Sequence, residues 1–495
     1  MKKFTKIVAT VSDRRCDVEF INDLFINGMN VVRMNSAHLS FDGFSKIVNN
    51  VRKVSNRIGI LMDTKGPEIR TTNNNFDDKD TPIIISAGDK IEFVGDPDSL
   101  SSPQRICLSY PGIANDVNIG NHLLIDDGEL DFIIDNIDNG IIYATALNSG
   151  KLGARKSVNI PGVAINLPSL TPRDITNIGY AIDLDIDFIA HSFVRSANDV
   201  KAIQKILDER GSSIKIISKI ENQEGIDNFD EILDVSYGIM IARGDLGIEI
   251  PAERIPAIQR NLIDRCIRAH KPVIVATQML HSMISNPRPT RAEVSDIANA
   301  VYQHTDALML SGETAYGDYP IEAIATMTRV AKEAERSMIE NNKAIIPNIE
   351  HDVTSFLARQ AVKSNSVLGT RAIITDSYTG RTARYVASYR GLFPTLALCY
   401  HENVVRLLAL SYGVWAIHQP STSSSRQYLR NGLMHLLESN LLTNDDFIAY
   451  LGGGFGEGHG TTFLEINKVS EVMENYHTYS LPNLEDVEQS APSNR

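Results

Sequence analysis

Short apolar runs rich in β-branched residues recur through the first 345 residues, and stretches with helical periodicity separate them. The apolar runs span residues 6–10, 30–35, 58–64, 188–193, 215–220, 237–243, 273–278 and 307–310. The helical stretches span residues 17–27, 41–55, 171–183, 197–210, 225–234, 252–270, 291–303 and 321–341. Continuous apolar strands are typical of a parallel sheet that is covered on both faces. These units predict an α/β fold, a (β/α)8 TIM barrel, with a doubly wound open sheet as the alternative.

One interval interrupts this repeat, between the third apolar run and the helix that should follow it. Residues 72–167 contain strand-like runs and the hairpin signals Asp127-Gly128 and Asn139-Gly140 instead. We therefore expect a β-rich domain inserted into a barrel made of residues 1–71 and 168–345. An insertion at this point leaves the barrel at the carboxyl ends of its strands, where active sites form. This predicts an all-β lid domain, the alternative being an insertion without a function.

A third pattern begins near residue 346. Strand-like runs at 371–375, 395–398, 414–417 and 446–451 alternate with helical stretches, which predicts a separate C-terminal α/β domain over 346–470. Residues 471–495 grow polar and are expected to form a tail.

The charge and the cysteines exclude several classes of protein. The chain has 48 basic and 61 acidic residues, so its net charge is −13, which disfavours binding to nucleic acid or anionic membranes. No apolar run reaches the roughly 18 residues of a membrane helix, and the start does not match a secretory signal. The 4 cysteines are scattered without a CxxC pair. A cytoplasmic protein with reduced thiols is the expectation.

Charged side chains gather at the ends of two neighbouring strands. Lys219 and Glu221 are two residues apart and share a face of their strand, and Asp245 follows the next strand. Two carboxylates on adjacent strand ends can hold a divalent cation while leaving positions open for water and substrate. The alternative is an ordinary cluster of ion pairs at the mouth of the barrel.

Oxygen-bearing side chains and arginines also follow the second and third strands. Asn35, Asp63 and Thr64 carry the oxygens that a hard monovalent cation prefers, and Arg33 and Arg70 can clamp a phosphate. Surface ion pairing is the alternative for each of these residues.

The candidates together favour phosphoryl transfer, which needs positive charge around the oxygens of the moving group. Thr277, at the end of the seventh strand, could bind substrate or relay a proton, although such a residue more often caps a turn. The chain has no GxxxxGK[ST] sequence, which excludes a P-loop site. The glycine-rich stretch 452–460 is either a backbone nest for a phosphate or an ordinary loop.

Seven segments, in order, resemble the pyruvate kinase family. They are TKIVAT (5–10), GMNVVRMN (28–35), DTKGPEIR (63–70), KIEN (219–222), ARGDLG (242–247), ATQML (276–280) and MLSGETA (309–315). The resemblance extends over the chain to about Val469 and includes the strand ends described above.

This resemblance implies a barrel with an inserted lid and a C-terminal regulatory domain, assembled as a homotetramer. It also implies the family's reaction in glycolysis, in which phosphoenolpyruvate and ADP give pyruvate and ATP. Lys219 would stabilise the phosphoryl group in flight, and Glu221 and Asp245 would hold Mg²⁺ or Mn²⁺. Gly244, Asp245 and Thr277 would bind the substrate, with Thr277 near the path of the proton to the enolate carbon.

The nucleotide and potassium sites follow from the same matching. The nucleotide-binding residues would be Arg33, His38, Arg70 and Lys156, with Arg33 acting in catalysis as well. The K⁺ ligands would be Asn35, Asp63 and Thr64. The chain departs from the family at Ala37, where a serine hydroxyl usually ligates K⁺, and Ser36 is its neighbour. The strength of K⁺ binding is therefore left open, as are the base contacts near residues 12–15.

The C-terminal domain contains a segment, 375–383, that resembles the family's effector phosphate loop but looks longer. Thr379, Gly380 and Thr382 would bind a sugar phosphate or nucleotide effector, unless the site is vestigial. Two other functions stay open on the sequence: a metal-dependent barrel lyase acting on pyruvate or an oxo acid, and a non-catalytic sensor of sugar phosphates.

Overall fold

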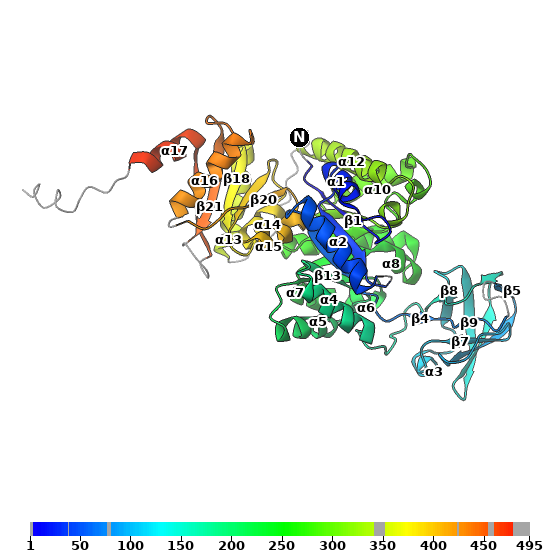
Figure 1. The fold of residues 1–495 in the computed structure, drawn as a ribbon. Helices are drawn as coiled ribbons and strands as arrows, with labels where there is room; N and C mark the ends of the chain where they lie inside the picture. Colours follow the sequence, from blue (N-terminus) through cyan, green and yellow to red (C-terminus); the bar gives the residue numbers. More distant parts are fainter. Residues whose placement is uncertain are drawn as a thin grey trace, which may run out of the picture. The chain divides into compact units, whose positions relative to one another are not determined.

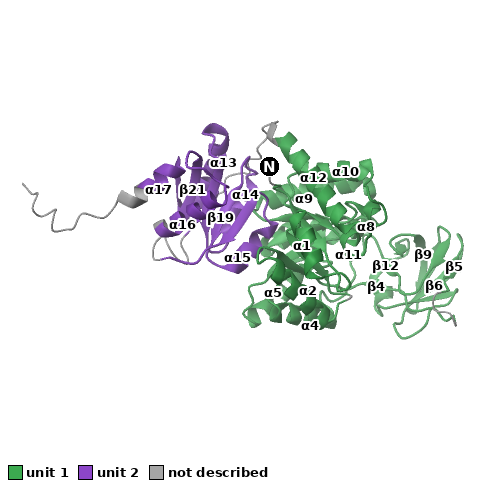
Figure 2. Ribbon diagram, turned by 45° about the horizontal axis from the view of Figure 1, so that its top comes forward, with its two compact units in different colours: residues 1–340 green, residues 341–495 purple. Residues whose placement is uncertain are grey.

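The computed structural model describes residues 3–37, 39–76, 81–340, 352–422, 425–453 and 460–478. The chain forms two compact units, residues 1–340 and 341–495 (Figure 2). The first unit contains a closed barrel and an inserted β-sheet domain, and the second unit is an α/β domain. In the described part of the chain, no helix has both the length and the apolar character needed to cross a bilayer.

The barrel closes because β1 pairs in parallel with both β17 and β2. Around the barrel, the strands are β1 (Lys6–Thr10), β17 (Ala307–Leu310), β16 (Val273–Ala276), β15 (Gly238–Ala242), β14 (Lys215–Ile220), β13 (Phe188–His191), β3 (Gly59–Asp63) and β2 (Val31–Asn35). Residues of both faces are buried in β1, β3 and β15, which explains their continuous apolar sequence. The predicted TIM barrel is confirmed, and the open-sheet alternative is wrong.

Helices cover the barrel strands on the outside (Figure 1). They are α1 (Val18–Ile26), α2 (Phe41–Val54), α4 (Pro172–Asp183), α5 (Ala197–Glu209), α6 (Gln223–Asp227), α7 (Phe229–Val235), α8 (Arg243–Glu249), α9 (Ile255–Arg268), α10 (Arg291–Tyr302), α11 (Gly312–Ala315) and α12 (Pro320–Glu340). Three features differ from the expectation, and one of them is α11, which lies outside every predicted helical stretch. The helix predicted over 225–234 is broken at Asn228 into α6 and α7, and α8 begins directly after β15.

The inserted domain is a seven-stranded sheet with a two-stranded sheet beside it. The strands of the larger sheet are, in order, β4 (Ile69–Arg70), β12 (Ser157–Asn159), β8 (His122–Ile125), β9 (Leu130–Asp138), β10 (Ile141–Ala146), β6 (Lys90–Gly95) and β7 (Arg105–Leu108). The smaller sheet pairs β5 (Ile83–Ile85) with β11 (Gly150–Leu152), and a short helix, α3 (Ile113–Asp116), completes the domain. Ile69 packs in the apolar core of this domain, so its sheet begins before residue 72.

The predicted Asn139-Gly140 turn joins β9 to β10. Both residues have positive φ, 50° at Asn139 and 81° at Gly140, and the flanking strands pair in antiparallel fashion. This is the backbone that a type I′ hairpin requires, and asparagine and glycine adopt it at least cost.

The second unit is built on a five-stranded sheet of order β20-β19-β18-β21-β22. The strands are β18 (Ala372–Ser377), β19 (Thr395–Cys399), β20 (Val414–His418), β21 (Phe447–Gly453) and β22 (Thr461–Lys468), with only β22 antiparallel to its neighbour. The helices are α13 (Val353–Val367), α14 (Arg381–Ser388), α15 (Glu402–Leu407), α16 (Ser425–Glu438) and α17 (Val469–Thr478). One apolar core contains residues of α16 and α17, and another contains residues of α13 and α14, so helices cover both faces of the sheet.

The predicted tail does not begin at residue 471. Helix α17 continues to Thr478, and its Val472 is buried in the core formed with α16. The expectation was wrong for 471–478 because the sequence shows polarity but not which face of a short helix packs. Residues 479–495 lie outside the described part of the chain.

A buried carboxylate joins the two ends of the barrel sequence. Glu335, in α12, accepts hydrogen bonds from the backbone N–H groups of Phe4, at 3.0 Å, and Thr5, at 2.7 Å. These residues lead into β1, and Glu335 is 1% exposed. The last helix of the barrel thereby holds its first strand in register.

We expect Glu335→Ala to lower the free energy of unfolding by about 3 kcal/mol, because two buried N–H groups lose their acceptor. Chemical denaturation followed by circular dichroism measures this change. Glu333→Ala is the matched control, since Glu333 lies on the same helix and its side chain is 69% exposed; we expect a change within about 0.5 kcal/mol. Equal effects of the two substitutions would contradict the anchoring role.

Candidate active site

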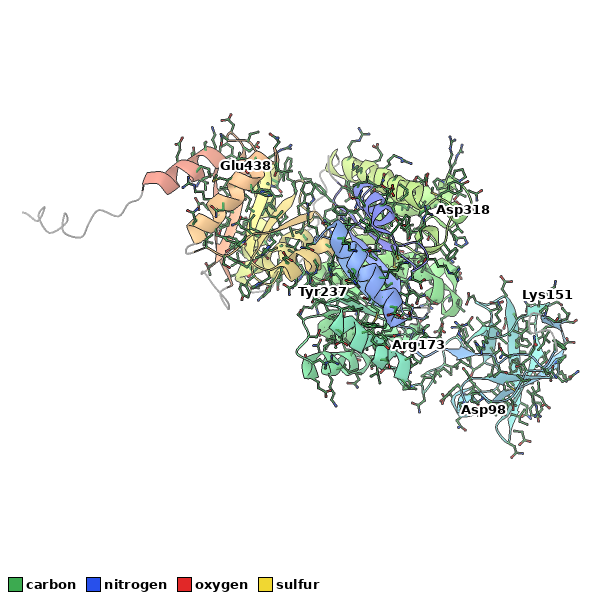
Figure 3. The ribbon with its side chains drawn as sticks, viewed as in Figure 1. Asp98, Lys151, Arg173, Tyr237, Asp318 and Glu438 are labelled. Atoms are coloured by element: carbon green, nitrogen blue, oxygen red, sulfur yellow. The ribbon has the colours of Figure 1, made fainter. Side chains whose placement is uncertain are left out.

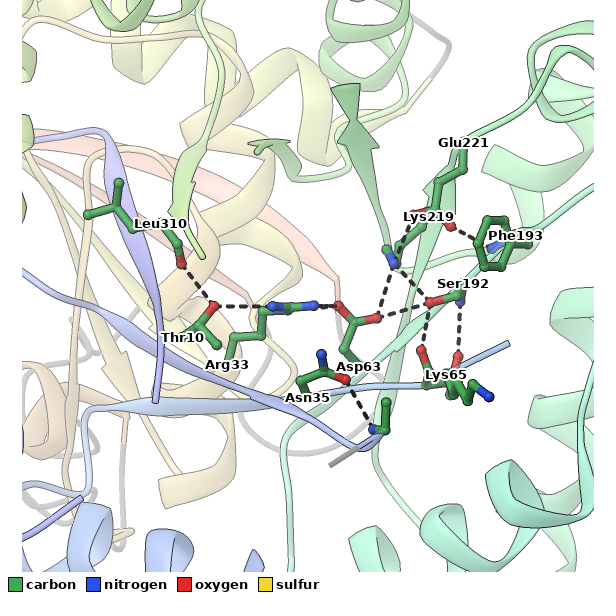
Figure 4. A network of polar contacts seen from close by, with 12 residues as sticks. Thr10, Arg33, Asn35, Asp63, Lys65, Ser192, Phe193, Lys219, Glu221 and Leu310 are labelled. Atoms are coloured by element: carbon green, nitrogen blue, oxygen red, sulfur yellow. Dashed lines mark hydrogen bonds and ion pairs between the residues drawn. The ribbon is translucent and has the colours of Figure 1, made fainter. Parts of the chain in front are cut away.

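Lys219 is the centre of a buried charge cluster at the carboxyl end of the barrel (Figure 4). Its Nζ lies 2.8 Å from Oε1 of Glu221, 3.3 Å from Oδ1 of Asp63 and 2.8 Å from the hydroxyl of Ser192. Lys219 is 9% exposed, Glu221 2% and Asp63 1%. The structure therefore brings Lys219 together with one residue predicted to bind Mg²⁺ and one predicted to bind K⁺.

Arg33 extends this cluster on the far side of Asp63. Its Nε donates to Oδ2 of Asp63 at 2.7 Å, and its Nη1 donates to the hydroxyl of Thr10 at 3.2 Å. The Thr10 hydroxyl in turn donates to the carbonyl of Leu310 at 2.9 Å. Strands β1, β2, β3 and β17 are therefore joined by one polar chain at the mouth of the barrel (Figure 4).

The pKa values of this cluster follow from burial and neighbouring charge. Burial opposes ionisation of Asp63, but the charges of Arg33 and Lys219 hold its pKa below the usual value. Burial also opposes protonation of Lys219, but Asp63 and Glu221 raise its pKa. Lys219 is thus a permanent positive charge at neutral pH, as stabilisation of a phosphoryl group requires.

Glu221 and Asp245 have the chemistry of a divalent-cation site. Oε2 of Glu221 accepts the N–H of Phe193 at 2.6 Å, and Oε1 faces the ammonium group of Lys219 at 2.8 Å. Burial raises the pKa of Glu221, the charge of Lys219 opposes this increase, and repulsion from Asp245 adds to it. A bound cation would offset the effects of burial and of Asp245, so these carboxylates fit Mg²⁺ or Mn²⁺. The described residues contain no cluster of three or more His, Cys, Asp or Glu suited to a metal.

Thr277 has a strained backbone at the end of β16. Its φ is 72°, which is rare for a β-branched residue and costs about 1–3 kcal/mol. Its hydroxyl donates to the carbonyl of Ala276 at 2.6 Å and accepts the N–H of Gly244 at 2.7 Å. Arg243 supports this conformation, because its Nη2 donates to the carbonyl of Thr277 at 2.8 Å. The structure thus brings together Thr277 and Gly244, two of the residues predicted to bind the substrate.

The three predicted K⁺ ligands lie at the ends of β2 and β3, where Asn35 is in register with Asp63. Each already has an internal contact. Oδ1 of Asn35 accepts the N–H of Ala37 at 3.0 Å, and the Thr64 hydroxyl accepts the N–H of Ser192 at 3.0 Å. Their amide, carboxylate and hydroxyl oxygens fit a hard monovalent cation.

A cavity of about 590 Å³ contains the predicted nucleotide-binding residues Arg70 and Lys156 together with Glu221 and Asp245. Lys156 pairs with Asp126 at 2.7 Å, and Arg70 pairs with Glu68 at 2.8 Å. The cavity is lined by the barrel and by the inserted domain. Arg33 and Thr277 are not among its lining residues, and His38 lies outside the described residues.

Comparison with known proteins identifies the family of this chain. The sequence-family model of the pyruvate kinase barrel domain matches residues 2–324. The sequence-family model of the pyruvate kinase alpha/beta domain matches residues 356–466. The chain belongs to the pyruvate kinase family. The pyruvate kinase of Borreliella burgdorferi is 43% identical over 482 residues, which is 96% of this chain and 99% of that protein. The pyruvate kinase of Bacillus licheniformis is 40% identical over 480 residues, 95% of this chain and 81% of that one.

A solved structure gives the same result. The crystal structure of a pyruvate kinase from Cryptosporidium parvum superposes with a TM-score of 0.87 at 36% identity and covers 94% of this chain and 96% of its own. As a member of the pyruvate kinase family, the protein is a phosphotransferase. The lyase and sensor alternatives find no support in these relatives.

The predicted effector residues lie at the start of α14 in the pyruvate kinase alpha/beta domain. Gly380 has a φ of 80° and precedes the helix, and the Thr382 hydroxyl is 2.7 Å from that of Thr461. The carbonyl of Thr379 accepts a hydrogen bond from Arg384 at 3.4 Å. Residues 454–459 of the glycine-rich stretch lie outside the described residues, so its predicted role is not tested.

Sequence reasoning missed three residues that contact the candidate site. Ser192 contacts Lys219, the N–H of Phe193 contacts Glu221, and Arg243 holds Thr277. Ser192 and Phe193 follow β13, so the rule that identified the other strand ends could have identified them. Backbone N–H contacts have no signal in side-chain identity.

We expect Thr277→Ala to lower kcat by about a hundredfold, because the hydroxyl and its bond to the Gly244 N–H are lost. Thr277→Ser keeps the hydroxyl and should stay within about tenfold of the unchanged enzyme. Steady-state turnover of phosphoenolpyruvate and ADP measures both. Wild-type turnover in Thr277→Ala would refute a role for the hydroxyl.

Proposed function

We propose that this protein transfers the phosphoryl group of phosphoenolpyruvate to ADP through residues at the mouth of its barrel, forming pyruvate and ATP. The observation that carries the proposal is the charged Lys219, held between Asp63 and Glu221 at a strand end. A positive charge fixed in a buried site stabilises the anionic phosphoryl group without reorganisation. Glu221 and Asp245 would hold Mg²⁺ or Mn²⁺, which supplies further positive charge to the substrate oxygens.

The inserted domain acts as a lid in this proposal. Lys156 is in that domain, and Arg70 is on the strand that enters it, so closure would bring both cations to the phosphates of ADP. Arg33 would contact phosphate from the barrel side, and His38 would join these nucleotide contacts. Lys156 and Arg70 now pair with Asp126 and Glu68, which a phosphate would displace.

Potassium would bind at Asn35, Asp63 and Thr64. The buried hydroxyl of Ser36 supports the site, because it has no hydrogen-bond partner within the described residues. A buried hydroxyl normally has a polar partner, and a bound K⁺ would supply one to Ser36. Ser36 would then supply the oxygen that the family usually takes from the position of Ala37.

The cellular location, the oligomeric state and an effector site complete the proposed function. A cytoplasmic location is supported by the four cysteines, which are all buried and form no disulfide among the described residues. A homotetramer is what family membership suggests. A sugar phosphate or nucleotide would bind at Thr379, Gly380 and Thr382, where the buried hydroxyls of nearby Thr375 and Ser377 lack partners within the described residues.

A coupled assay with Mg²⁺ and K⁺ tests the reaction, and Lys219→Met tests its centre. We expect kcat to fall by about a hundredfold to a thousandfold, while binding of phosphoenolpyruvate largely persists. Lys205→Met, at an exposed position, is the control and should leave turnover unchanged. No ATP formation by the unchanged protein would refute the proposed function. Full turnover in Lys219→Met would refute the proposed role of this lysine.

The potassium site makes a paired prediction. Ser36→Ala should raise the K⁺ concentration needed for half-maximal activity severalfold, because an oxygen ligand is lost. Ala37→Ser should lower that concentration, since it restores the family's hydroxyl. Titration of activity with KCl, with NaCl as the comparison, measures both. Ser36 is not a ligand if Ser36→Ala titrates like the unchanged protein.

A further inference from the structure

The loop of residues 192–195, between β13 and α5, contacts the charge cluster on one side. The hydroxyl of Ser192 accepts from Nζ of Lys219 at 2.8 Å and donates to the carbonyl of Thr64 at 2.7 Å. The N–H of Phe193 donates to Glu221 at 2.6 Å. Phe193 has a φ of 54°, a strained value that persists only where the surroundings enforce it. The loop therefore sets the positions of Lys219 and Glu221.

The same loop packs against the connection that leads into the inserted domain. Gly66 lies on this connection with a φ of 71°. A Cβ added to Gly66 would lie 2.8 Å from the ring of Phe193 and 2.9 Å from Cβ of Ser192. Only glycine permits so close an approach. The connection at Gly66 and the loop of residues 192–195 are therefore in direct contact.

Arg195 binds the connection that returns from the inserted domain. Its Nη1 donates to the carbonyl of Ile165 and its Nη2 to the carbonyl of Leu167, both at 2.7 Å. The residue between them faces the other way: the N–H of Asn166 donates to Asp116 of the inserted domain at 2.9 Å. Three successive residues are thus bonded in turn to the barrel, to the inserted domain and to the barrel again.

Arg195 is itself held firmly within the barrel. Its N–H donates to Asp199 at 2.9 Å, and its carbonyl accepts from Nδ2 of Asn228 at 2.9 Å. Asn228 is the residue at which α6 ends and α7 begins. A planar guanidinium that spans two carbonyls fixes direction as well as distance, which an ammonium group cannot do.

We propose that Arg195 is a positioning residue that couples the inserted domain to the catalytic cluster through the loop 192–195. Movement of the returning connection is transmitted through Arg195 and Phe193 to Glu221, and through Ser192 to Lys219. The position of the inserted domain and the geometry of the cation site therefore change together. This inference rests on the proposed roles of Lys219 and Glu221.

The first test measures the position of the inserted domain. Spin labels at Lys151→Cys, on β11 (Figure 3), and Lys205→Cys, on α5, report the distance between domain and barrel by pulsed electron paramagnetic resonance. The native cysteines are buried, which favours labelling of the introduced ones. We expect Arg195→Met to broaden the distance distribution. An unchanged distribution would overturn the proposal.

Arg52 provides a matched control within the barrel. Its side chain is 21% exposed, against 20% for Arg195, and it donates to the carbonyl of Ile58 and to Asp187. Arg52→Met should lower stability without broadening the distribution. Equal broadening by Arg52→Met and Arg195→Met would overturn the proposal. Arg195→Lys keeps the charge and serves where Arg195→Met does not fold, with a smaller effect in the same direction.

The second test measures the coupling itself by Mn²⁺ titration with electron paramagnetic resonance detection, in the absence of substrates. We expect Arg195→Met to weaken Mn²⁺ binding by about tenfold, the effect of removing an outer support of a metal ligand. Asp116→Ala removes the acceptor of the Asn166 N–H and so uncouples the inserted domain from the returning connection. It should broaden the distances while keeping wild-type Mn²⁺ affinity, because the bonds of Arg195 to that connection remain. Wild-type affinity in Arg195→Met would overturn the coupling. Failure of the unchanged protein to bind Mn²⁺ would instead contradict the proposed cation site.

Discussion

The buried alternation of charge from Arg33 through Asp63 and Lys219 to Glu221 is the constraint around which the rest of the site is arranged. Buried ions are costly unless each is paired and hydrogen-bonded. Here the pairing crosses β2, β3 and β14, so it can form only when the barrel is closed in the correct register. The same contacts that hold these charges inside the protein leave the ammonium group of Lys219 positive.

Most of the first unit could be predicted from the sequence, because its information is local and periodic. Apolar runs at regular intervals specify strands that are covered on both faces. A polar residue that follows such a strand lies at the mouth of the barrel, where the carboxyl ends of the strands meet. Lys219, Asp63 and Thr277 were identified in this way. The Asn139-Gly140 turn was predictable because its backbone conformation restricts the residue types.

The features that the sequence did not predict depend on contacts between residues that are distant in the sequence. The break between α6 and α7 at Asn228 coincides with a bond to Arg195, thirty-three positions earlier in the chain. The role of Arg195 is invisible in the sequence because its acceptors, the carbonyls of Ile165 and Leu167, carry no residue identity. Similarly, the antiparallel β22 and the packing of α17 follow from which face of each segment finds an apolar partner.

The left-handed backbone of Thr277 has a consequence for the engineering of this enzyme. Glycine would adopt the same φ without strain, so a selection for heat resistance alone would favour it, or would be indifferent to losing the hydroxyl. Thr277 therefore keeps its hydroxyl at a cost in stability of about 1–3 kcal/mol that glycine would not carry. A variant library scored only by melting temperature would select against this hydroxyl, to which we assign a role in turnover.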